Sequence, residues 1–138
     1  MSVRGGEPTQ LTNDFTMLPA VSPDGKWIAC YYWDGQNKFQ PKIAVIAAEG
    51  GSPTKIFDDV PSGIRPIKWA ANGRSVTYID QQNGAFNIWS MSLKGGQPQR
   101  VTNFNSERLF SFGWSADGKY LACSRGVVTN EVVLITEK

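Results

Sequence analysis

The sequence of 138 residues contains no histidine and only two cysteines, Cys30 and Cys123. Histidine is the usual general base and the commonest metal ligand, so its absence argues against hydrolytic and metal-dependent chemistry. Two cysteines are too few for a zinc site or a disulfide framework. The sequence therefore predicts a protein that is not an enzyme, with no catalytic, cofactor-binding or metal-binding residues.

Excess charge and long apolar runs are missing as well. Fourteen Lys and Arg stand against twelve Asp and Glu, and the basic residues are spread singly along the chain. A nucleic-acid-binding domain usually carries a basic patch, and a membrane-spanning helix needs about 20 apolar residues. We therefore expect no nucleic-acid partner and no membrane insertion.

What the sequence does have is an internal repeat. A Gly-Gly pair followed by Pro two residues later occurs three times, at Gly5-Gly6, Gly50-Gly51 and Gly95-Gly96, with a period of 45 residues. A fixed period in this range is typical of repeat architectures, in which each unit buries its face against the next.

A second marker runs in step with the first and predicts hairpin turns at 22–26, 70–74 and 115–119, each with Asp-Gly or Asn-Gly between apolar runs. Short strands are expected before each turn (18–21, 66–69, 110–114) and after it (27–31, 76–79, 120–124). A third strand follows (43–47, 88–93, 132–136), and a fourth carries Leu11, Ile56 or Val101. Four antiparallel strands in 45 residues predict one blade of an all-β propeller. The expected single domain, 1–138, contains repeats at about 15–58, 59–103 and 104–138, the last completed by an outer strand of the 1–14 type.

Matching positions in the repeats predict what is buried. Ile28 and Cys30, Val76 and Tyr78, and Leu121 and Cys123 alternate in the second strands, so each pair should share a buried face. Both cysteines are therefore predicted to be buried thiols that pack as small hydrophobic groups. Trp69 and Trp114 precede their turns at equivalent positions, which favours packing between blades over ligand stacking.

The residues 22–29 (Ser-Pro-Asp-Gly-Lys-Trp-Ile-Ala), the strand around Asn87-Ile88-Trp89 and the Gly-Gly turn together resemble the TolB-like propeller repeat, a relative of the WD-repeat blade. The resemblance covers the chain in three copies. It implies a non-catalytic bacterial module for protein–protein interaction or sensing, in the periplasm or another extracytoplasmic space rather than the cytoplasm. The alternative that it leaves open is an accessory or sensor propeller of a larger enzyme, such as a bacterial serine/threonine protein kinase or a prolyl-oligopeptidase-type peptidase.

Three blades are too few for a ring, since propellers use about four to eight. The chain starts like the end of a third strand and stops on another third strand, so we expect the C-terminal half of a larger propeller. Apolar blade faces rarely stay exposed. We therefore expect either a homodimer that closes a six-bladed ring or completion by the rest of a parent chain.

Residues that could bind a partner lie on the predicted rim and channel. The proposed innermost strands contain no Asp or Glu, which excludes a glycosidase carboxylate pair and a calcium site there. Arg65 and Lys68 could hold an anion, or they could be solvated with their stems packed on apolar neighbours. Aromatic and Arg residues on loops are common interface anchors, and the candidates of this kind are Trp33, Phe39, Arg108 and Phe110. Trp33 and Phe39 could instead pack across their own long hairpin.

Overall fold

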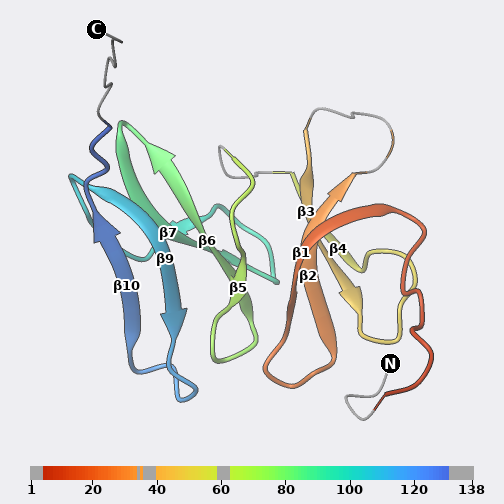
Figure 1. Ribbon diagram of the computed structural model, residues 1–138. Helices are drawn as coiled ribbons and strands as arrows, with labels where there is room; N and C mark the ends of the chain where they lie inside the picture. The colour runs from red at the N-terminus through yellow and green to blue at the C-terminus, as the bar shows by residue number, and fades with distance from the viewer. Residues whose placement is uncertain (1–4, 34, 36–39, 59–62, 131–138) are drawn as a thin grey trace, which may run out of the picture.

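The computed structural model describes residues 5–33, 35, 40–58 and 63–130. These residues form ten β-strands and no helix, arranged in three antiparallel sheets (Figure 1). Blade 1 contains β1 (Phe15–Val21), β2 (Trp27–Trp33), β3 (Lys42–Ala47) and β4 (Lys55–Phe57). Blade 2 contains β5 (Lys68–Trp69), β6 (Ser75–Gln82), β7 (Ala85–Ser92) and β8 (Gln99–Arg100). Blade 3 contains β9 (Arg108–Trp114) and β10 (Leu121–Gly126). The predicted all-β fold with four-stranded antiparallel sheets is confirmed.

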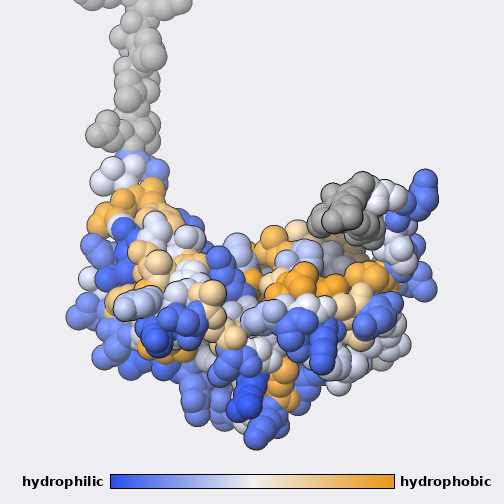
Figure 2. Space-filling view, turned by 90° about the horizontal axis from the view of Figure 1, so that it is seen from below, coloured by the Kyte–Doolittle hydropathy of each residue, from blue (hydrophilic) through white to orange (hydrophobic). Residues whose placement is uncertain are grey.

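The three blades lie side by side as an open arc. Figure 1 shows the blades in chain order, and Figure 2, from below, shows a crescent that is hollowed on one side. The two views together place β1, β5 and β9, the first strands of the blades, along this hollow. The rest of each sheet extends away from the hollow, in the strand order 1-2-3-4 in blades 1 and 2.

The predicted turns join the first and second strands. In blade 1 the Ser22 hydroxyl donates to Asp24 Oδ1 at 2.6 Å, and the Lys26 N–H donates to the same oxygen at 3.1 Å. The Trp27 N–H donates to the Ser22 hydroxyl at 2.9 Å, and residues 115–120 repeat all three bonds. The Ser22 hydrogen bond, followed by the Lys26 N–H, lowers the pKa of the Asp24 carboxyl. Ser and Asp therefore act as turn residues that bond their own backbone.

The core lies between the blades. One apolar cluster joins β2 and β3 of blade 1 to β6 and β7 of blade 2, and a second joins blade 2 to Leu109 and Phe112 of blade 3. Ala29 and Tyr31 are fully buried, and so is Cys30 between them at 1% exposure. The second strands of blades 1 and 2, β2 and β6, are thus buried on both faces, and the expectation of one buried face per strand was too narrow for them.

Tryptophan side chains tie the blades together, as predicted. The Trp69 indole N–H donates to the Ala20 carbonyl of blade 1 at 2.8 Å. The Trp114 indole N–H donates to the Thr77 hydroxyl of blade 2 at 3.2 Å. Both Trp residues end the first strand of their own blade, so the same position is used at both junctions.

The prediction that both cysteines are buried is wrong for Cys123. Cys123 is exposed, whereas Cys30 is buried. In blade 1, β3 pairs with the outer edge of β2 and places Ala44 opposite Cys30. No described strand pairs with the corresponding edge of β10, so Cys123 has a neighbour only on the β9 side, at Phe112. Equivalent sequence positions have unequal burial because their neighbours differ.

The outer and inner strands also differ in length from the prediction. β1 begins at Phe15 and β9 at Arg108, earlier than expected. Fourth strands are short: β8 ends at Arg100, just before Val101, and Leu11 lies outside any described strand. The segment at Leu11 is nevertheless docked on blade 1, because its carbonyl accepts the Gly51 N–H at 2.9 Å.

The docking of Leu11 on the Gly-Gly turn can be tested with a matched pair of variants. Gly50 and Gly51 both have positive φ, 93° and 108°, but a Cβ on Gly50 would lie 2.6 Å from the Leu11 carbonyl oxygen, whereas one on Gly51 meets open space. Both Ala variants are strained by about 1–3 kcal/mol. Gly50→Ala should lower the free energy of unfolding in urea by about 1–3 kcal/mol more than Gly51→Ala, because the clash adds an overpacking cost. Equal losses would contradict the docking.

Candidate functional site: the upper rim

The candidate site is the upper rim, which we define as the described parts of the two connections between blades, 63–67 and 101–107, together with the strand ends beside them. These segments lie at the upper ends of the blades in Figure 1. Connections of this kind usually carry the functional residues of a rigid scaffold. A buried side chain of blade 1 anchors the first connection. A buried side chain of blade 2 and an arginine of blade 3 anchor the second.

Tyr31 anchors the first connection. Its hydroxyl accepts the Arg65 backbone N–H at 3.2 Å and donates to the Gly63 carbonyl at 3.4 Å. Burial raises the pKa of the Tyr31 phenol, with the Arg65 backbone bond opposing it. The phenol thus stays neutral and can donate and accept, which fixes the backbone that carries Arg65.

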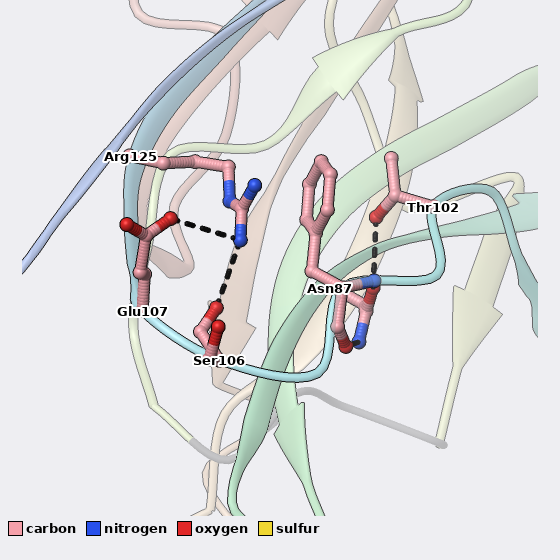
Figure 3. Close-up of polar contacts among 6 residues, drawn as sticks. Asn87, Thr102, Ser106, Glu107 and Arg125 are labelled. Atoms are coloured by element: carbon pink, nitrogen blue, oxygen red, sulfur yellow. Dashed lines mark hydrogen bonds and ion pairs between the residues drawn. The ribbon is translucent and has the colours of Figure 1, made fainter.

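Asn87 anchors the second connection from below. The side chain is 3% exposed. Its Oδ1 accepts the Phe104 N–H at 2.7 Å and the Thr102 hydroxyl at 3.0 Å, and its Nδ2 donates to the Phe104 carbonyl at 3.0 Å (Figure 3). The Thr102 hydroxyl in turn accepts the Ile88 N–H at 2.9 Å. Asn87 therefore replaces the strand pairing that is missing beyond β8.

Arg125 holds the same connection from blade 3. Its guanidinium carbon lies 3.7 Å from the centre of the Phe104 ring, and Nη2 donates to the Ser106 carbonyl at 2.9 Å. The same nitrogen forms an ion pair with Glu107 Oε2 at 3.1 Å (Figure 3). Glu107 has a positive φ of 66°, which this clamp supports. Arg125 is a structural residue, occupied on several sides.

Three other cations on the rim and hollow side lie over phenyl rings. The Arg65 guanidinium lies 5.0 Å from the Phe86 ring centre, Lys68 Nζ lies 5.7 Å from the Phe112 ring and the Arg108 guanidinium lies 6.0 Å from the Phe110 ring. Within the part of the chain that the structure describes, none of these three cations has a carboxylate partner. Their charge is held in place by the rings and is available to an outside anion.

Five of the six residues named from the sequence lie in the described part of the chain. Arg65, Lys68, Arg108 and Phe110 lie on β5, β9 and the connection before β5, and Phe110 is 45% exposed. Trp33 lies at the end of β2 and packs edge-on against Phe15 of β1, with ring centres 5.0 Å apart. Trp33 therefore packs against the first strand of its own blade, whereas the sequence raised packing across the hairpin that follows Trp33. Phe39 lies outside the described residues.

Sequence reasoning missed the anchors. Asn87 enters the sequence-based prediction only as part of a strand pattern. A polar residue directly before the apolar Ile88 and Trp89 is the signal from which a buried amide could have been inferred. Nothing in the sequence singles out Tyr31 or Arg125, because both roles depend on contacts between blades. Phe104 likewise looks like an ordinary loop aromatic until Arg125 stacks on it.

Elsewhere, an open pocket of ≈ 370 Å³ lies between the hairpin turns of blades 2 and 3, lined by both turns and Trp114. Its one carboxylate, Asp117, already accepts the Ser115 hydroxyl at 2.6 Å. Among the described residues no group of His, Cys, Asp or Glu could hold a metal ion. Those residues also contain no helix that could cross a membrane.

Comparisons with known proteins agree with the repeat. No protein-family profile matches the chain. An uncharacterized protein of Agrobacterium fabrum is 28% identical over 102 residues, which are 73% of this chain and 33% of that protein. The structure is similar to a TolB structure from Agrobacterium tumefaciens, with a TM-score of 0.59 and 26% identity over 81% of this chain and 37% of that one. TolB from Acinetobacter baumannii gives a TM-score of 0.62 at 22% identity, over 83% of this chain and 27% of that one.

The resemblance to TolB-like propellers is confirmed. The chain spans about a third of the relatives that it matches. The all-β arc is thus similar to part of a larger TolB-like propeller. At this level of identity the Acinetobacter baumannii structure supports the fold alone.

The Asn87 anchor predicts a large loss of stability on truncation. Asn87→Ala would leave the Phe104 N–H and the Thr102 hydroxyl without their acceptor. Each buried group left unpaired costs about 1–3 kcal/mol, so urea unfolding should show a loss of about 2–4 kcal/mol. Asn103→Ala, in the same connection but exposed, should change stability by less than about 0.5 kcal/mol. Similar effects of the two variants would contradict the anchor.

The two thiols should differ in reactivity. Burial raises the pKa of the Cys30 thiol to about 11, whereas Cys123 is exposed and its pKa is raised less, with Arg125 opposing the shift. A disulfide reagent at pH 8 should label Cys123 in the folded protein and Cys30 only after unfolding. Cys123→Ser should then show no fast labelling. Two thiols reacting together in the native protein would contradict the structure.

Proposed function

We propose that this chain is a non-catalytic propeller module that binds an acidic stretch of a protein partner along its upper rim and hollow. The observation that carries the proposal is the set of three cations, Arg65, Lys68 and Arg108, that lie over phenyl rings and pair with no carboxylate among the described residues. The similarity to TolB-like propellers supports an interaction module at a coarse level.

The chemistry of this surface favours a peptide with carboxylates and apolar groups together. Phe110 and Ile64 are 45% and 46% exposed beside the cations, so a ligand can bury apolar surface while it pairs with positive charge. Arginine and aromatic residues are the side chains that most often dominate protein interfaces. The anchored backbone reduces the ordering cost of binding, because Tyr31 and Asn87 already hold the connections.

The proposal extends to location and assembly. The resemblance to TolB-like proteins favours a periplasmic or other extracytoplasmic setting over the cytoplasm. We propose that further blades complete the open arc. They come either from a second copy of this chain, in a six-bladed homodimer, or from the rest of a longer chain. An accessory role beside an enzyme domain would use the same binding surface.

Titration with an acidic probe tests the binding surface. A fluorescein-labelled, Glu-rich dodecapeptide containing Phe should bind the protein, and its Gln-for-Glu counterpart should bind far more weakly. Arg65→Gln, Lys68→Gln and Arg108→Gln should each weaken binding by about two- to fivefold, since an exposed ion pair contributes up to about 1 kcal/mol. Added salt should weaken it further by screening.

Lys94→Gln is the matched control, because Lys94 is exposed at the Gly-Gly turn of blade 2 and forms no ion pair with the acids that the structure describes. It should bind the acidic peptide like the parent protein. A loss as large as that of Arg65→Gln would show that binding follows net charge alone. Equal binding of the Gln peptide would show that the cations do not recognise carboxylates. Either result would overturn the proposal.

A further inference from the structure

The junctions between blades share one hydrogen-bonded arrangement, with a variation. At the first junction the Trp69 indole reaches the Ala20 carbonyl directly at 2.8 Å. At the second the Trp114 indole donates to the Thr77 hydroxyl at 3.2 Å, and that hydroxyl donates to the Lys68 carbonyl at 2.9 Å.

The acceptors occupy one repeat position. Ala20 and Lys68 each precede the last residue of a first strand, and they pair in register with Ala29 and Thr77 respectively. Where blade 1 has the methyl group of Ala29, the indole of the next blade reaches the carbonyl. Where blade 2 has Thr77, fully buried, its hydroxyl stands between indole and carbonyl and is satisfied on both sides.

Blade 3 repeats the acceptor position on a face that no described element covers. Gly113 pairs with Ala122, as Ala20 pairs with Ala29. Tyr120 is 72% exposed, and Ala122 and Ser124 are exposed too. Their counterparts in blades 1 and 2 are covered by the next blade: Trp27 and Ser75 are half-buried, and Ala29, Thr77, Tyr31 and Ile79 are buried.

A second copy of this chain would not fit this face well. The residue of blade 1 that corresponds to Trp69 and Trp114 is Val21, the last residue of β1, and it is 63% exposed. The valine side chain has no N–H to donate and fills far less space than an indole. A two-copy ring would therefore lack the tryptophan contact wherever blade 1 of one copy met blade 3 of the other.

We infer that the outer face of blade 3 is an interface for a further propeller blade that carries tryptophan directly before its first hairpin turn, with the Gly113 carbonyl as the acceptor of its indole N–H. The interface continues the two junctions within the chain, and the match covers only 37% and 27% of the TolB structures that the chain resembles. The inference rests on the propeller architecture of the proposed function and chooses between its two ways of completing the arc.

Giving blade 1 the missing indole tests the inference in the full chain. Val21→Trp should make the chain self-complementary and tighten its self-association by about tenfold or more in sedimentation velocity, since a pocketed tryptophan often dominates an interface. Val21→Phe, which adds a ring without an N–H, should gain less. The exposure of Val21 makes both variants compatible with folding, and circular dichroism checks this.

A charge on the blade 3 face should abolish the gain. In the Val21→Trp background, Ser124→Asp should return the protein to the parent's self-association, whereas Gln97→Asp, an equally exposed change at the Gly-Gly turn of blade 2, should leave the gain intact. A folded Val21→Trp protein that associates no better than the parent would overturn the inference. So would a parent that already forms a stable species of twice the 15.2 kDa chain mass and is unaffected by Val21→Trp.

The acidic-peptide titration is a separate readout. It depends on Arg65, Lys68 and Arg108, none of which is altered in these variants, and it can be measured at concentrations where the parent is a single species. Loss of peptide binding would sink the proposed function and leave the junction intact. Failure of the folded Val21→Trp protein to associate would overturn the junction and leave the proposed function intact.

Discussion

Burial of the middle strands of blades 1 and 2 against the sheet of the following blade is the constraint on which this structure depends. A four-stranded sheet in water can expose one face, but β2 and β6 are apolar on both faces and need a cover on each. The cover comes from the next blade, so the unit of stability is the junction rather than the blade. Tyr31 and Ile79 are buried only because a following blade lies against them. This coupling is why stability in repeat proteins is shared between neighbours.

Divergence between the repeats is compensated at the junctions. Thr77 adds a buried hydroxyl where blade 1 has Ala29, a change that would normally leave a polar group unsatisfied at a cost of about 1–3 kcal/mol. The hydroxyl instead accepts from Trp114 and donates to the Lys68 carbonyl. The indole, the hydroxyl and the carbonyl therefore form a chain in which every member is paired, and the two junctions keep the same tryptophan with different chemistry around it.

The sequence was informative where local chemistry decides the structure. The Asp-Gly turn at 22–26 could be predicted because its Ser and Asp bond their own backbone, and it forms as expected. The repeat period also predicted that Trp69 and Trp114 pack between blades. Prediction failed where a residue's environment is set by another segment: Cys30 and Cys123 occupy the same repeat position, yet among the described strands a third strand lies beside Cys30 and none beside Cys123. The sequence also does not show that Arg125 is held by contacts that Arg108 lacks, because those contacts are made with Phe104, Ser106 and Glu107 in another segment.

These contacts separate Arg125, a structural residue, from the two arginines that we propose as binding residues. Arg125 is stacked at 3.7 Å and bonded to a carbonyl and a carboxylate, so an incoming anion would have to compete with contacts already made. Arg65 and Arg108 lie farther from their rings, at 5.0 Å and 6.0 Å, and none of the acids in the described residues pairs with them. In the proposed function, a ligand carboxylate would form a new ion pair there without displacing a described acid, while the rings limit the side-chain freedom that is lost on binding. The contacts of Arg125 with Phe104, Ser106 and Glu107 fix the connection that leads into β9, the strand that begins at Arg108.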